Sequence, residues 1–109
     1  MTPNTQAMQR LLDAVEAGRV GQFRNLDSEF GHGNGIHAKR AYNGSLDAAK
    51  ALHEALLPGW DLLITTYEDG LFEVSVSEPL VVKTYDGLSE IIARAWLIAI
   101  IRAVMAGER

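Results

Sequence analysis

The spacing of apolar residues divides the chain into helical and extended stretches. Apolar side chains recur every three or four residues from Thr5 to Ala17, which predicts an amphipathic helix that ends at Gly18. A second stripe predicts a helix over Ser45–Leu57, with its first residue as the N-cap and a Pro-Gly pair as its stop. The shorter stripe of Phe23–Phe30 predicts a short helix between them.

Three stretches rich in β-branched and aromatic residues predict strands. They are Trp60–Tyr67, Leu71–Ser77 and Leu80–Tyr85, and the turns after them contain Asp69-Gly70, Glu78-Pro79 and Asp86-Gly87. Because tight turns join consecutive strands, we expect antiparallel pairing. The apolar runs that start at Leu62 and Leu80 predict that these strands are covered on both faces.

The last predicted helix, Leu88–Ala106, contains the run Ala95–Ile101, which is apolar on every side. Such a helix is normally buried all round, and one small sheet cannot enclose it, so another helix or a second subunit must. We therefore expect one α+β domain over residues 1–109, a helix–sheet–helix (α-β-α) sandwich with a small antiparallel three-stranded sheet. Arg94 and Arg102 interrupt the helix and are expected at the surface or at a subunit rim, with anion binding as the alternative.

Composition narrows the class of protein. The chain has 109 residues, 48% hydrophobic and 22% charged, which is enough for a core without covalent staples. It has no cysteine, which excludes disulfides, thiolate metal sites and cysteine nucleophiles. The net charge of −4 argues against a general nucleic-acid or membrane-surface binder, and Ile91–Ala106 is short for a span of about 20 residues. Residues 1–42 carry net positive charge and 43–109 net negative charge, so an anionic ligand should prefer the first part.

Several segments, in order, resemble the phage ABA sandwich domain family over residues 24–106. These segments are Leu26-Asp27, Tyr42–Leu52, Pro58-Gly59-Trp60, Phe72–Val76 and the Ala-rich helix Ile91–Ala106. The resemblance implies an α-β-α sandwich and a bacteriophage or prophage origin. It implies no established activity, because these motifs are caps, stripes and strand starts. We expect the protein in the host cytoplasm.

The glycine-rich stretch Gly31–Asn43 is the candidate binding loop. Glycines expose backbone N–H groups that can hold an anion, and the following helix N-terminus also attracts anions. The side chains offer basic, amide and ring groups for a nucleotide-like ligand. The candidate ligand-binding residues are His32, Asn34, Gly35, His37, Lys39, Arg40, Tyr42 and Asn43. The alternative is a solvated connector, and the stretch lacks the Gly-Lys-Ser/Thr ending of a P-loop.

Other chemistry has weaker support. His32 and His37 with Asp27 or Glu29 could bind a metal, but the spacing fits no established zinc pattern. The carboxylates of the hairpin are expected to be solvated, Trp60 and Trp96 to pack in the core, and His53 to lie at the surface. We therefore predict no catalytic residue, no metal, no cofactor and no enzymatic activity.

Two hypotheses follow. In the first, the chain is a small phage accessory protein that sequesters an anionic, nucleotide-type signal of host immunity, as a homo-oligomer formed through the C-terminal helix. In the second, it is a protein–protein module, either an inhibitor of a host protein or a virion-associated accessory, and the acidic second part of the chain is its contact surface.

Overall fold

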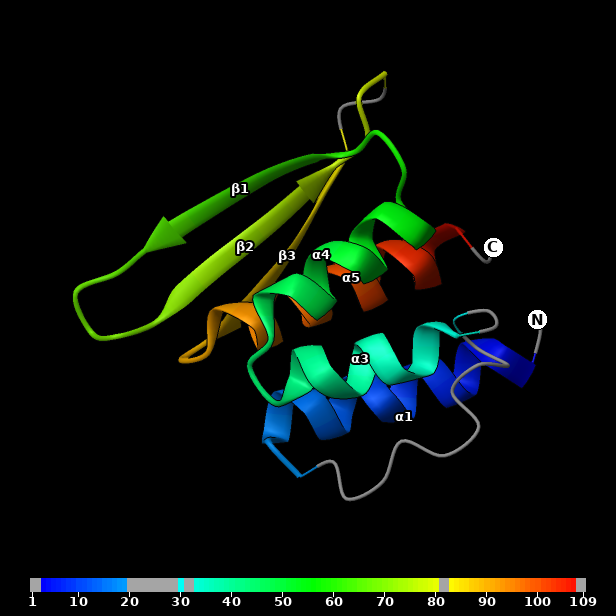
Figure 1. Cartoon of the computed structure of the whole chain (residues 1–109), viewed down its shortest axis with the longest axis horizontal. Coiled ribbons are helices and arrows are strands. Elements are labelled where there is room, and N and C mark those ends of the chain that lie inside the picture. Colours follow the sequence, from blue (N-terminus) through cyan, green and yellow to red (C-terminus); the bar gives the residue numbers. More distant parts are fainter. Residues whose placement is uncertain (1–2, 20–29, 31–32, 81–82, 108–109) are drawn as a thin grey trace.

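The computed structural model describes residues 3–19, 30, 33–80 and 83–107, and it shows an α+β chain with helices before and after an antiparallel sheet (Figure 1). The helices are α1 (Pro3–Ala17), α3 (Asn34–Tyr42), α4 (Leu46–Leu56) and α5 (Ile92–Gly107), and the strands are β1 (Asp61–Thr66), β2 (Phe72–Ser77) and β3 (Thr84–Ser89). The predicted class and the helix–sheet–helix order are confirmed. The predicted helix Phe23–Phe30 lies outside the described residues except for its last position.

Local signals set the ends of the first helices as predicted. Gly18 takes a φ of +68°, a left-handed conformation that glycine adopts without strain, and the two amides after α1 bond back to its last turn. At α4, the Ala48 N–H donates to the Ser45 side chain over 3.1 Å. The predicted N-cap of this helix is therefore confirmed, and it satisfies one of the free amides of the first turn.

The sheet is a meander in the order β1-β2-β3, with Leu63 opposite Ser75 and Val74 opposite Gly87. The predicted turn after β1 is confirmed, with Gly70 at a φ of +87° and a Tyr67 N–H to Leu71 carbonyl bond of 2.9 Å. Val74 and Val76 of β2 are fully buried and Phe72 is half-buried, which agrees with the predicted alternation.

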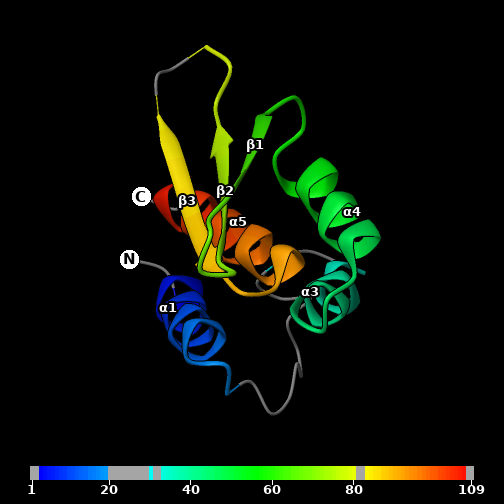
Figure 2. The ribbon, with the colours of Figure 1, turned by 90° about the vertical axis from the view of Figure 1, so that its left-hand side faces the viewer.

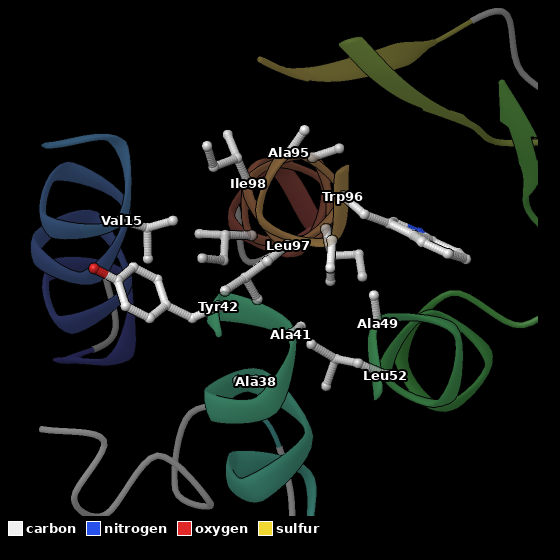
Figure 3. Packing of buried hydrophobic residues seen from close by; sticks show 14 of the residues in the cluster. Val15, Ala38, Ala41, Tyr42, Ala49, Leu52, Ala95, Trp96, Leu97 and Ile98 are labelled. Atoms are coloured by element: carbon white, nitrogen blue, oxygen red, sulfur yellow. The ribbon is translucent and has the colours of Figure 1, made fainter. Parts of the chain in front are cut away.

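Helix α5 is the centre of the molecule. Figure 2 shows it under β2 and β3, with α1 on one flank and α4 on the other, and Figure 3 shows α3 on the side away from the sheet. Each residue from Trp96 to Ile101 is at most 6% exposed. The predicted enclosure of this helix is confirmed, and one chain supplies all of it. The predicted homo-oligomer relied on exposed apolar surface of this helix. Within one chain, other elements already cover that surface.

The predicted third strand was placed too early. β3 is Thr84–Ser89, so the expected Asp86-Gly87 turn lies inside a strand and α5 begins four residues later than predicted. Gly87 is required by packing instead: a Cβ there would lie 2.0 Å from the carbonyl oxygen of Ala95 and 2.8 Å from the nitrogen of Ala99. An Asp-Gly pair indicates a turn by local preference, but here the glycine lets a helix approach the sheet closely.

The prediction that both faces of the apolar runs are covered is wrong for the first run and for Leu80, and Val81 and Val82 lie outside the described residues. Leu62, Leu63 and Ile64 are 40%, 63% and 40% exposed, and Leu80 is 96% exposed in the turn after β2. Helix α5 packs on β2 and β3, whereas β1 packs mainly against β2. The first strand is therefore an edge strand that lies beyond the reach of the central helix.

His53 was expected at the surface but is buried on the α4 face that packs against α5. The Trp96 indole N–H can only donate, so it donates to His53 Nδ1 over 3.1 Å, and His53 Nε2–H then donates to the Trp60 carbonyl, also over 3.1 Å. This geometry requires the neutral imidazole. The predicted packing of Trp96 in the core is confirmed, and Trp60 packs partly buried against the core.

Candidate functional site

The candidate loop Gly31–Asn43 is mostly a helix. α3 spans Asn34–Tyr42, and Gly33 precedes it at a φ of +83°. Three glycines in five residues indicated a loop, but Ala38 and Ala41 are fully buried in the core, and this packing outweighs the low helix propensity of Gly35. The predicted loop is therefore a helix from Asn34 to Tyr42, and Gly31 and His32 lie outside the described residues.

The helix separates the predicted site residues. Tyr42 is buried, with the Arg94 guanidinium carbon 3.9 Å above its ring, and Gly35 is buried within α3. The Asn34 side chain donates to the Phe30 carbonyl over 2.7 Å. These three residues support the fold and offer no ring or backbone cradle to a ligand.

Asn43 is exposed at the C-cap of α3, with its N–H bonded to the Lys39 carbonyl. Lys39 is also exposed, and His32 lies outside the described residues. A metal site of His32 and His37 with Asp27 or Glu29 cannot be placed, because three of these four residues also lie outside that part. Among the described residues, no group of three metal-ligating side chains gathers.

Two predicted residues do come together. His37 and Arg40, one turn apart on α3, line a shallow cleft of about 290 Å³ with Ser45, Asp47 and Ala48 at the start of α4. The guanidinium, the imidazole and the helix N-terminus favour a small anion, and the Asp47 carboxylate opposes one. The cleft can hold a phosphate-sized group, and the imidazole of His37 is the one ring in its lining.

A second cleft, of about 310 Å³, lies between the end of α1, the ends of the hairpin strands and the start of α5. Arg94 lines it, and its Nε donates to the Tyr42 carbonyl over 3.1 Å, so this half-buried cation caps the C-terminus of α3. Glu16 and Glu90 also line the cleft, and Glu16 pairs with Arg102. Arg94 is thus engaged within the fold. The positive charges of Arg94 and Arg102 are balanced by the negative charges of Glu16 and Glu90.

The most exposed apolar feature of the sheet is the outer edge of β1. The Tyr67 N–H to Leu71 carbonyl bond shows which residues of β1 are hydrogen-bonded to β2. Hydrogen-bonded and non-hydrogen-bonded pairs alternate along an antiparallel strand. The backbone groups of Asp61, Leu63 and Thr65 point to β2, and those of Leu62, Ile64 and Thr66 point outward. This edge therefore presents unpaired backbone groups between apolar side chains on both faces.

The opposite edge, β3, has one outward-pointing backbone group with a partner. Arg102 of α5 donates to the outward-pointing carbonyl of Asp86 and pairs with Glu16 of α1. On the face of the sheet away from α5, Ser75 bonds Asp86 over 2.7 Å and Ser77 bonds Thr84 over 3.1 Å. Leu88 lies opposite Glu73 on this face and is 51% exposed. Leu88 of β3 is also exposed, but among the three strands only β1 has consecutive exposed aliphatic side chains. The exposed run of leucine and isoleucine could have indicated this edge, but the same run also suits a strand buried on both faces.

No family model matches the chain, and no curated protein or solved structure matches it at a significant level. The resemblance to the phage ABA sandwich domain family therefore stays a prediction. Within the described part of the chain, no helix has the length and apolarity needed to cross a bilayer.

Proposed function

We propose that this chain is a non-enzymatic protein-interaction domain whose contact element is the free edge of β1. The observation that carries this proposal is the combination of unpaired backbone groups with exposed Leu62, Leu63 and Ile64 on a single strand. An edge strand of this kind is a template for another strand, and natural proteins usually block such an edge. Binding of an extended segment at a sheet edge is a common mode of peptide recognition.

The distribution of polar groups favours a partner beside β1 over a partner on the open face of the sheet. A partner on that face would remove water from Glu73 and Asp86, which cross-strand hydrogen bonds hold there. A strand added at the edge leaves these carboxylates hydrated. It also covers Leu63 on one face and Leu62 and Ile64 on the other.

The test is site-specific photocrosslinking in cells that produce the protein. A photoreactive phenylalanine derivative replaces Leu63, and a matched variant carries it at Ser75, which lies opposite on β2 and faces the polar surface. We expect adducts at position 63 that map by mass spectrometry to one extended segment with apolar residues. Adducts that are no more frequent at 63 than at 75 would contradict the proposal.

A second candidate is capture of a small anion, the chemistry of a phage accessory protein that sequesters a nucleotide-type immune signal. The cleft of His37 and Arg40 beside the N-terminus of α4 supports it. Because Tyr42 is buried, its ring cannot stack on a base, and recognition in this cleft rests mainly on the phosphate group. The candidate therefore predicts similar binding of inorganic phosphate, cyclic nucleotides and ADP-ribose derivatives.

A thermal-shift titration with these ligands tests the second candidate, because a ligand that binds only the folded state raises the melting temperature by mass action. We expect Arg40→Ala to abolish the shift. Lys50→Ala is the control, since it removes one positive charge from an exposed position of α4 outside the cleft lining. Equal shifts in both variants, or no shift in the unmodified protein, would exclude this cleft as the site.

A further inference from the structure

Resting on the proposed function, we infer that the segment that pairs with β1 is the β1 strand of a second copy. The two copies then share one antiparallel sheet, related by a two-fold axis perpendicular to it. Such an interface uses the same surface of both chains, so the strand must be complementary to itself. The sequence of β1 meets this condition in one register.

A two-fold axis perpendicular to the sheet pairs only residues whose side chains lie on the same face. Because faces alternate along a strand, the axis must lie at the level of one residue, which then faces its own copy, and not midway between two residues. With the axis at Leu63, this residue lies opposite its own copy on the open face. Leu62 then lies opposite Ile64 on the α5 face, and their outward-pointing backbone groups bond each other. Each exposed aliphatic side chain of the strand thereby contacts another aliphatic side chain.

The neighbouring registers are poorer. An axis at Leu62 places Asp61 opposite Leu63, so a carboxylate loses water against an aliphatic side chain. An axis at Ile64 places Leu62 and Leu63 opposite Thr66 and Thr65, which leaves both leucines without an aliphatic neighbour. With the axis at Leu63, Asp61 lies opposite Thr65, and no like charges oppose each other. The side chains of β1 therefore specify one register for a second copy.

The absence of cysteine allows a direct test. Leu63 and its copy would form a non-hydrogen-bonded pair, with a Cα separation of about 4.5 Å, within the roughly 4.4–6.8 Å range of disulfides. We expect Leu63→Cys to give a covalent dimer under mild oxidation. Thr65→Cys should not, because the two residues would lie four positions apart, about 13 Å along the strand. Ser75→Cys, opposite on β2, is the second control.

Sedimentation gives an independent measurement on the unmodified chain. We expect a dimer that dissociates on dilution, and a monomer with unchanged far-ultraviolet circular dichroism for Leu63→Lys, because this position is 63% exposed and folding does not depend on it. Equal crosslinking at 65 or 75, or a monomer at all concentrations with no disulfide at 63, would overturn the second copy as partner. If the photoreactive residue at 63 then captured another protein's extended segment, the proposed function would stand. If it captured nothing, both proposals would fail.

Discussion

The two edge strands of the sheet, β1 and β3, have the same length but differ in how far the rest of the chain packs against them. β3 lies directly against α5, and its outward Asp86 carbonyl is bonded to Arg102. β1 lies on the far side of β2 and presents leucine and isoleucine to solvent. The comparison shows that strand sequence alone does not secure an edge; the position of the central helix does.

The difference has an energetic consequence. Full burial of a leucine side chain contributes roughly 1.5–3 kcal/mol. At β3, α5 covers one face, Arg102 occupies the outward carbonyl of Asp86, and Leu88 is the one exposed aliphatic side chain, so an added strand would gain less there. At β1 the gain is still available to a partner, which is why association is expected at that edge.

The largest expected loss of stability comes from a substitution that forces α5 away from β3. Gly87→Ala places a Cβ against the carbonyl of Ala95 and the nitrogen of Ala99, and neither backbone atom can move without the helix. We expect a loss of more than about 3 kcal/mol in the free energy of unfolding, measured in urea. Gly107→Ala at the end of α5, where a Cβ meets nothing within 4 Å, is the control and should lose nothing.

The next effect concerns the start of β1. His53 accepts from Trp96 and donates to the carbonyl of Trp60, the residue before the strand, and so ties β1 to α4 and α5. His53→Ala leaves both groups without this partner, and we expect a loss of about 2 kcal/mol by the same measurement. His37→Ala on α3 should stay within about 0.5 kcal/mol. A similar loss in both variants would show that the histidine relay does not anchor the strand.

Removal of the cover of β3 should have a smaller effect. Arg102→Ala deletes the bond to the Asp86 carbonyl and the pair with Glu16, both near the surface, and we expect a loss of about 1 kcal/mol. Glu16→Ala removes only the ion pair, so a loss as large as that of Arg102→Ala would mean that the edge bond contributes nothing.

The smallest expected effect concerns a hydrogen bond on the open face of the sheet, just after β1. The Tyr67 hydroxyl donates to Glu73 over 2.9 Å, and this hydrogen bond, followed by the negative charge of Glu73, raises the pKa of Tyr67 above its ordinary value of 10.0. The bond therefore supports folding fully below pH 10.0, and this support is lost as the pH rises through the raised pKa. Tyrosinate absorbance, with Tyr67→Phe to isolate the residue, checks this. Glu73→Gln should lower the pKa of Tyr67, and an unchanged titration would contradict the assignment.

The fold was more predictable from the sequence than the candidate site. Stripes and caps located α1 and α4, and alternation located β2, because these signals act over a few neighbouring residues. The predictions failed for Gly87 and Gly35, where the glycine signal indicated turns or loops. The reason is that each glycine lies under or within a packed helix, and no local pattern records what will pack against it.

By itself, the sequence determined the α+β class, the order of the elements and the need to enclose the apolar run of α5, since periodicity and burial of apolar surface follow directly from residue types. Only the tertiary structure decided which strands α5 covers, because that depends on contacts between segments distant in the chain. That choice buried Tyr42 and His53, left Leu63 in solvent, and so moved the candidate site from the glycine-rich segment to the edge of β1.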